Sequence, residues 1–301
     1  KGVIIEEINM YEDMPQRHVQ DLMMKLLYGD QPAGWSVAGE KKNILNMKRD
    51  DFVAYKKKHY LPEATVIVVA GQVTEKQVFD EVNKIFKDVK CGHKGKKIKT
   101  KDTQSKSEVL VNFKKTDQTH FVLAVRTYDL FDKKNASISV LSGVLGGGMS
   151  SRLFVKLREE LGVCYYVRAY NDAYTDHGFL QISAGVDNKR INEVVEVVLG
   201  ECKKLKDYKV SEEELNKVKE CLIGNMKLSL ELSDDIANFY GGQELLKREI
   251  LKAEKKAKEI RATTANQVQA LAKNIFKNNK LNLALIGPFK QRAQFSKILK
   301  F

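Results

Sequence analysis

Residues that could take part in chemistry gather within residues 141–166, LSGVLGGGMSSRLFVKLREELGVCYY. Three successive glycines, at 146–148, can adopt backbone conformations that are closed to other residues. Ser150 and Ser151 follow them, where the N-cap of a helix is expected. The pattern predicts that a glycine-rich loop leads into a helix at this point.

Two arginines and a tyrosine follow this loop, in the predicted helix and in the strand after it. In the predicted helix, leucines recur every four residues and form a buried stripe: Leu153, Leu157 and Leu161. Arg152 and Arg158 fall off this stripe, so we expect them to face solvent or a cleft. Gly162 stands where a C-terminal cap is expected, and a tyrosine-rich strand is predicted over residues 163–170. Tyr165 in this strand follows Arg158 by seven residues.

Two simpler interpretations of the loop and helix stay open on the residues alone. A solvated arginine helix that is packed by leucines accounts for the pattern without any chemistry. A phosphate-binding loop is the second, because glycines before a helix N-terminus suit anions. Against it, no Gly-Lys-Ser/Thr follows the glycines, and nothing marks an acidic partner for a ribose.

Two adjacent glutamates lie near the start of the sequence, in a predicted helix. Residues 1–11, KGVIIEEINMY, carry apolar side chains at helical spacing. Glu7 lies at the edge of the stripe that this helix would bury, and its neighbour Glu6 diverges from it by about 100 degrees. On the residues alone, the two glutamates are a charged helix edge.

Histidine and cysteine spacing indicates no complete metal site. No histidine has a histidine partner three or four residues away, so we expect structural or surface roles for all five: His18, His59, His93, His120 and His177. The four cysteines show no Cys-x-x-Cys spacing, which favours free thiols in a reducing compartment: Cys91, Cys164, Cys202 and Cys221.

The composition is that of an ordinary globular protein in which basic residues outnumber acidic ones. A chain of 301 residues can hold two domains with substantial cores. The net charge of +13 would suit a polyanionic partner, but the lysines are spread widely and no nucleic-acid motif is present. No apolar run reaches the length of a membrane span. These features favour neither nucleic acid nor a membrane as partner.

A lysine-rich linker divides the predicted elements into two groups. Residues 87–107 contain eight lysines and almost no apolar side chains, so they cannot build a core. We predict a first domain at residues 1–90, a linker at 91–107 and a second domain at 108–301. The first domain is mainly helical around a short buried strand at residues 65–70, whereas strands and helices alternate in the second.

An internal repeat relates the two domains. Residues 58–71 match residues 274–287 in the order of helix, turn, strand and glycine, at an offset of 216. At the same offset, residues 47–55 correspond to residues 263–271, helix on helix. The second copy begins near residue 108, so the first copy is expected to lack its front half, which would expose an unpaired sheet edge.

The glycine-rich stretch and the start of the sequence resemble a known family. GGGMSSRLFVKLREELGVCYY is similar to the second-domain signature of the insulinase-like (M16) zinc metallopeptidases, which include mitochondrial processing peptidase and short bacterial members. GVIIEEINM is similar to the segment that carries the family's third zinc ligand. The resemblance implies an α+β fold of two homologous domains, each with a mainly antiparallel sheet flanked by helices, the first domain incomplete in this chain.

The resemblance also implies the residues of an active site. The family's two zinc-binding histidines and its general base belong to a His-x-x-Glu-His motif, which this sequence lacks and which is expected upstream of it. Glu7 matches the third zinc ligand, and Glu12 is expected to line the cleft as a supporting acid. Arg158 and Tyr165 match an arginine and a tyrosine that close over the substrate near the scissile bond. Close bacterial relatives often carry a histidine where this chain has Gln20.

The function implied by these matches is a Zn²⁺-dependent endopeptidase that encloses peptides or unfolded segments between two domains, with the linker as hinge. Without the upstream motif, the chain alone is expected to be inactive. A non-catalytic homologue or partner subunit that retains the fold for assembly is the alternative, and a basic polyanion-binding protein is a third hypothesis. Expected partners are a peptide substrate, an N-terminal segment of the same protein and a homo- or heterodimer partner. The expected compartment is the cytoplasm, with the mitochondrial matrix as alternative.

Overall fold

The computed structural model describes residues 1–89, 92, 95–247 and 249–301, and these residues form two compact units. The first unit combines three stretches of the chain: Lys1–Leu45, Lys99–Leu222 and Glu259–Phe301. The second consists of Asn46–Ile98 and Ile223–Lys258. Helices and strands are mixed, which confirms the α+β class. The predictions for Cys91 and His93 lie outside the described residues.

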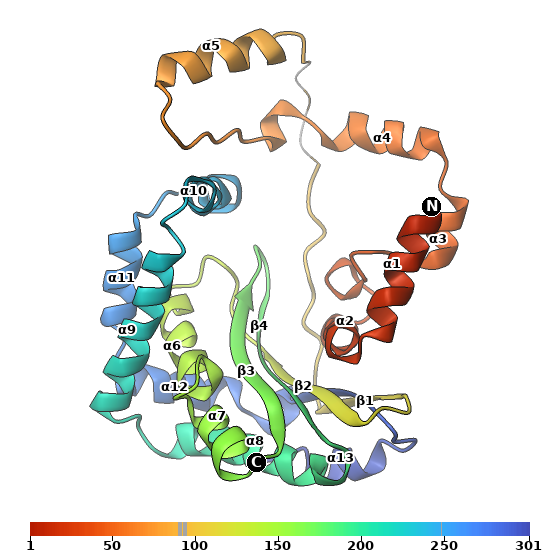
Figure 1. The fold of residues 1–301 in the computed structure, drawn as a ribbon, viewed down its shortest axis with the longest axis vertical. Coiled ribbons are helices and arrows are strands. Elements are labelled where there is room, and N and C mark those ends of the chain that lie inside the picture. Colours follow the sequence, from red (N-terminus) through yellow and green to blue (C-terminus); the bar gives the residue numbers. More distant parts are fainter. Residues whose placement is uncertain (90–91, 93–94, 248) are drawn as a thin grey trace. The chain divides into compact units, whose positions relative to one another are not determined.

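A five-stranded sheet lies at the centre of the first unit (Figure 1). Its strands have the order β1-β5-β2-β4-β3, in which β1 and β5 pair in parallel and the other pairs are antiparallel. The bounds are β1 Glu108–Phe113, β2 Gln118–Arg126, β3 Cys164–Ala173, β4 Gly178–Asp187 and β5 Asn282–Gly287. The sequence predicts all five, and β2, β4 and β5 read as apolar runs because both of their faces are buried.

Helices α6, α8 and α12 pack on one face of this sheet and build the larger core (Figure 1). Their bounds are Asn135–Gly146, Ile191–Asp207 and Ala265–Ile275. The remaining elements of this part of the unit are short: α7 Arg152–Phe154, the π-helix η3 Val155–Glu160, the 3₁₀ turns η4 Asn188–Arg190 and η5 Asn278–Lys280, and α13 Ala293–Ile298. Together they confirm a sheet flanked by helices in the second half of the sequence.

The opposite face of the sheet is covered by α2 (Pro15–Tyr28), which comes from the start of the sequence (Figure 1). A second core joins four buried side chains of α2 to side chains of β2, β4 and β5: Val19, Met23, Leu27, Tyr28, Val122, Ala124, Phe179, Ala284 and Ile286. The preceding helix α1 (Gly2–Asp13) is separated from α2 by one residue, Met14. Helices predicted within residues 1–90 therefore pack on the sheet of the second half. The domain limits themselves stay a prediction.

The second unit holds a set of helices. Four elements lie wholly within it: α4 Arg49–His59, η2 Pro62–Ala64, α5 Glu75–Phe86 and α10 Ser233–Lys247. Three helices belong to it only in part: α3 Lys41–Asn46, α9 Glu212–Leu228 and α11 Ala253–Arg261. The 3₁₀ turn η1 Pro32–Gly34 belongs to the first unit. Within the described part of the chain, no helix combines the length and the apolar character that a membrane span needs.

The strand expected at residues 65–70 is wrong. These residues form no strand, and Val66, Ile67, Val68 and Val69 are 37% to 49% exposed. No described strand pairs with them, so their backbone groups lack strand partners and their apolar side chains stay partly exposed. An apolar run becomes a buried strand only where neighbouring strands are present.

The internal repeat is confirmed at the level of helices and turns. At the predicted offset of 216, α4 coincides with α12 at both ends, and η2 coincides with η5. The copies differ at the following segment, which is β5 in the second copy and irregular in the first. β5 lies between β1 and β2, which pair with both of its edges.

Candidate active site

The glycine run after α6 is required by a close approach between α6 and β3. A Cβ atom at Gly146 would lie 2.5 Å from the backbone nitrogen of Ala169, too close for any side chain. Gly147 caps α6, and Ser151 occupies the predicted N-cap position of α7. The Ser151 hydroxyl donates to the carbonyl oxygen of Gly148 at 2.6 Å instead of accepting from the helix. This loop borders a cavity of about 700 Å³.

The helix after the loop has the predicted leucine stripe, but its second half is a π-helix. Leu153 and Leu157 are fully buried. Gly162 follows the helix with φ of 60°, the left-handed conformation that favours glycine after a C-terminus. The N–H of Leu161 donates to the carbonyl oxygen of Lys156, five residues earlier, at 3.1 Å. Such π turns are frequent at functional sites.

The two arginines of this helix have different environments. Arg152 donates to both carboxylate oxygens of Glu214, at 2.8 and 2.7 Å, so it is a structural link to α9. Arg158 is exposed, and its Nη1 donates to the carbonyl oxygen of Cys164 at 2.9 Å. Among the described residues no carboxylate pairs with Arg158. The prediction of a side chain that faces solvent or a cleft therefore holds for Arg158 and is wrong for Arg152.

Arg158 and Tyr165 lie together at the start of β3. The guanidinium carbon of Arg158 is 5.2 Å from the centroid of the Tyr165 ring, within the range of a cation–π contact. The register of β3 against β4 shifts between Cys164 and Tyr166, so Tyr165 is the extra residue of a bulge. Bulges redirect side chains, and that of Tyr165 is 74% exposed. Both side chains thus offer hydrogen-bond donors to solvent, while their catalytic role stays a prediction.

The neighbouring Tyr166 is half-buried and has a different partner. Its hydroxyl oxygen lies 3.0 Å from Nδ1 of His120 on β2. A Cβ atom at Gly185, between them on β4, would approach the Tyr166 ring to 2.7 Å, so the contact requires glycine there. Burial raises the pKa of Tyr166 and lowers the pKa of His120. Burial therefore favours the uncharged form of both groups, and the tautomer of the imidazole determines which of them donates the hydrogen bond.

The predicted metal ligand, Glu7, is an exposed carboxylate on α1. In the part of the chain that the structure describes, no group of three or more His, Cys, Asp or Glu side chains could hold a metal ion. Glu7 could therefore offer a metal only one carboxylate from the described residues. Glu12 is already engaged, because its Oε2 lies 2.7 Å from Nζ of Lys41. α1 and the Arg158–Tyr165 pair belong to the same compact unit, and the roles of these residues stay predictions.

A second cavity, of about 1290 Å³, lies between α1, α2 and the residues that lead into β1. Its lining includes Glu12, His18 and Asp21 together with Arg126 and Asn282. Burial raises the pKa of the Asp21 carboxyl, and the nearby His18 opposes this shift. The wall of this cavity combines charged and apolar side chains, and it includes part of the predicted linker.

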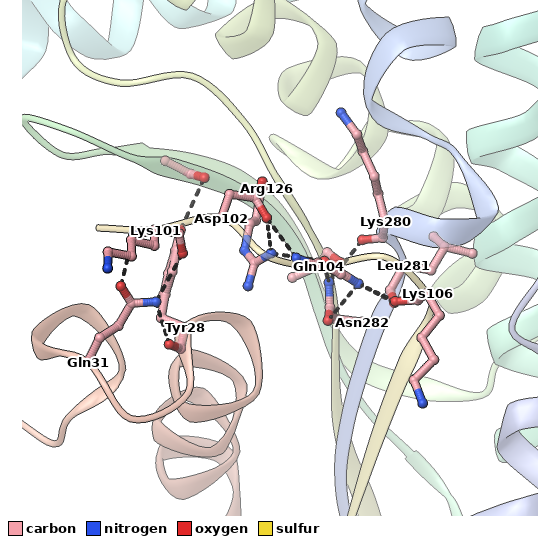
Figure 2. Close-up of polar contacts among 12 residues, drawn as sticks. Tyr28, Gln31, Lys101, Asp102, Gln104, Lys106, Arg126, Lys280, Leu281 and Asn282 are labelled. Carbon is pink, nitrogen blue, oxygen red and sulfur yellow. Dashed lines mark hydrogen bonds and ion pairs between the residues drawn. The ribbon is translucent and has the colours of Figure 1, made fainter. Parts of the chain in front are cut away.

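Hydrogen bonds hold that part of the linker against the sheet, as Figure 2 shows. The Gln104 and Asn282 side chains exchange two bonds, with Nε2 to Oδ1 at 3.2 Å and Nδ2 to Oε1 at 3.0 Å. Arg126 on β2 donates to Asp102 and also to Gln104, the latter at 3.4 Å. Asn282 is 1% exposed, so this network is anchored in the core. Asp102 and Gln104 of the predicted linker are therefore bound to the sheet, although Asp102 stays exposed to solvent.

A buried polar chain also joins α2 to the strands that carry the candidate site. The Nε2 of Gln181 on β4 donates to Oε1 of Gln20 at 2.6 Å and to the hydroxyl of Tyr170 on β3. Gln181 is 2% exposed. Sequence reasoning missed Gln181, although a glutamine inside the apolar run of residues 179–186 was an available signal. The sequence also left the glutamine at position 20 unexplained. The hydrogen bond from Gln181 gives this side chain a structural role.

Comparisons with curated proteins show related sequences. The family described as "Peptidase M16 inactive domain" matches residues 46–222. The uncharacterized zinc protease YmxG of Bacillus subtilis is 32% identical over 288 residues, which cover 96% of this chain and 69% of that protein. An uncharacterized zinc protease of Streptomyces coelicolor, SCO5738, is 28% identical over 298 residues, which cover 97% of this chain and 65% of that protein. The chain thus spans about two thirds of the length of these relatives.

Solved structures share the fold. A protease from Helicobacter pylori matches 95% of this chain and 71% of its own chain with a TM-score of 0.86 at 20% identity. A peptidase M16 inactive domain from Pseudomonas fluorescens matches 96% of this chain and 69% of its own with a TM-score of 0.82 at 19% identity.

Proposed function

The chain belongs to the peptidase M16 family, and from this premise we propose that it is part of a zinc-dependent endopeptidase that cleaves peptides or unfolded segments. Relatives named as zinc proteases match nearly all of the chain, which supports a peptidase-family role. The proposal of catalysis depends mainly on one observation, the exposed Arg158–Tyr165 pair at the start of β3.

Arg158 and Tyr165 would stabilise the charge that develops during peptide hydrolysis. Attack of water on a peptide carbonyl places negative charge on its oxygen, and hydrogen-bond donors aimed at that oxygen lower the barrier. The contacts of Arg158 with the Cys164 carbonyl oxygen and the Tyr165 ring restrain the guanidinium. Its other N–H groups and the Tyr165 hydroxyl are then available to a substrate carbonyl oxygen.

Glu7 would be the metal ligand that this chain supplies. An exposed carboxylate without an ion-pair partner among the described residues can donate an oxygen to zinc. When bound, zinc polarises the peptide carbonyl and lowers the pKa of a water molecule. We infer that two histidines and the general base come from a His-x-x-Glu-His motif outside this sequence, so that the chain alone is inactive. Glu12, paired with Lys41, would support α1 beside the cleft.

The peptide would be enclosed between two domains. Because residues 102–104 are held to the sheet, the hinge in this proposal lies earlier in the predicted linker. The N-terminal segment that carries the motif and a second subunit of the same family are the proposed protein partners. The buried free thiols of Cys164 and Cys202 support a reducing compartment, for which we propose the cytoplasm.

A non-catalytic subunit of the same family is the second candidate. It is favoured by the description of the matching family region, residues 46–222, as an inactive domain. Such a protein would use the fold for assembly, and its function would require neither Glu7 nor the Arg158–Tyr165 pair.

Zinc content and peptide cleavage of the full-length protein distinguish the two candidates. Three forms are compared: wild type, Glu7→Gln and the matched control Glu6→Gln, which changes the adjacent exposed carboxylate. We expect one zinc per chain and cleavage of an unfolded peptide in the wild type and in Glu6→Gln, with both lost in Glu7→Gln. Full-length wild type that binds no zinc and cleaves nothing would favour the non-catalytic subunit.

A further inference from the structure

We propose that Lys114, in the turn after β1, is a positioning residue for the helix that carries Glu7. The sheet of the second half of the chain would then determine where the metal ligand lies. This inference rests on the proposed function, because it takes Glu7 to be a ligand.

Lys114 binds the C-terminal end of α1. Its Nζ donates to the carbonyl oxygen of Glu12 at 3.1 Å and to Oδ1 of Asp13 at 3.0 Å. The last carbonyl groups of a helix have no partner within the helix, and a cation there also complements the helix dipole. The contact therefore satisfies an acceptor of α1 that would otherwise need water.

The backbone of Lys114 is itself fixed to the sheet. Its N–H donates to the carbonyl oxygen of Gly287, the last residue of β5, at 3.0 Å. β5 is paired on both edges and lies in the core. One residue thus connects the end of a buried strand to the end of α1.

The packing of α2 limits how α1 can move. Val19, Met23 and Leu27 of α2 are fully buried against the sheet. Met14, which joins the two helices, has an extended backbone, and its N–H donates to the carbonyl oxygen of Tyr11 at 3.2 Å. Met14 is therefore the joint between the fixed helix α2 and α1, and the Lys114 contact lies directly beside this joint.

A tilt of α1 about this joint would displace Glu7. Glu7 precedes Glu12 by five residues, which at 1.5 Å per residue is about 7.5 Å along the helix axis. Metal–oxygen distances must be correct to about 0.2 Å, so even a small tilt of α1 would weaken the bond. We expect loss of the Lys114 contact to weaken zinc binding about fivefold, below the 10- to 100-fold effect of partners that touch a ligand directly.

The test compares Lys114→Met with Lys115→Met in the full-length protein. Lys115 is adjacent and exposed, so its substitution removes the same charge without touching α1. Two quantities are measured: the zinc dissociation constant, by competition with a chromophoric chelator, and the amide hydrogen exchange of α1. Lys114→Met should raise the dissociation constant and speed the exchange of α1 amides, each about fivefold. Amide exchange in β2 should stay at its wild-type rate in both variants. In Lys115→Met, the zinc dissociation constant and the exchange of α1 amides should also match the wild type.

The two readouts separate this inference from the proposed function. If Lys114→Met matches Lys115→Met in α1 exchange, or if zinc affinity falls while α1 exchange is unchanged, the positioning role is overturned. If the wild type binds no zinc but α1 exchange still rises in Lys114→Met, the peptidase proposal fails and the helix-holding contact is supported. Weaker zinc binding together with faster α1 exchange supports both.

Discussion

Removal of one hydroxyl group at Tyr165 tests whether the bulge of β3 presents a catalytic donor. The substitution Tyr165→Phe keeps the ring that Arg158 contacts, with its guanidinium carbon 5.2 Å from the ring centroid. The phenol is 74% exposed, and within the described residues its hydroxyl has no hydrogen-bond partner. The unfolding free energy should therefore change by no more than about 0.5 kcal/mol.

The expected effect on catalysis is much larger. Loss of one donor to a developing oxyanion costs about 3 to 4 kcal/mol of transition-state stabilisation, a fall in kcat of about 10² to 10³. The Michaelis constant should change little, because the interaction forms in the transition state. The assay is cleavage of an unfolded peptide by the full-length protein, with urea denaturation of the same samples.

Tyr166→Phe is the matched control, because the same hydroxyl is removed one residue later. There the hydroxyl lies 3.0 Å from Nδ1 of His120, so its loss should lower the unfolding free energy by about 1 kcal/mol and leave kcat/KM within about twofold of wild type. The reasoning is refuted if Tyr165→Phe retains more than about a tenth of wild-type kcat. It is also refuted if the two variants lose equal activity.

Two further predictions concern packing and pH. Gly146→Ala should lower the unfolding free energy by about 1 to 3 kcal/mol, because the new Cβ atom would lie 2.5 Å from the backbone nitrogen of Ala169. Gly148→Ala, with open space around its Cβ position, should change it by less than about 0.5 kcal/mol in the same urea titration, and equal losses would contradict the packing. Burial holds the pKa of His120 below its ordinary value of 6.5, so the unfolded chain binds this proton more readily and stability should fall as the pH drops below 6.5. His120→Gln should reduce that fall between about pH 7.5 and 5.5, and an unchanged pH dependence would show that other groups cause it.

Local structure follows closely from the sequence in the second half of the chain. The leucine stripe predicts the helix that carries Arg158, and Gly162 has the left-handed φ of 60° expected after its end. The repeat predicts the offset of 216 that relates α4 to α12 at both of their ends. Such features are readable because they depend on neighbours a few residues away.

The same reasoning fails where an element depends on distant partners. Residues 65–70 have the composition of a buried strand, yet no described strand pairs with them. Arg152 resembles Arg158 in its place off the leucine stripe, but Glu214 binds it from another helix. Strand pairing and ion pairing are decided between elements, which periodicity does not describe.

The sequence by itself determined the family, the candidate residues Glu7, Arg158 and Tyr165, and the helices and strands that carry them. The tertiary structure decided how these residues are presented: the bulge that exposes Tyr165, and the packing of α2 and Lys114 that restrains α1. The physical reason is the range of the interactions. Caps, turns and apolar periodicity act over a few residues, whereas Lys114 and Glu12 are about a hundred positions apart in the sequence and meet only when the sheet is assembled.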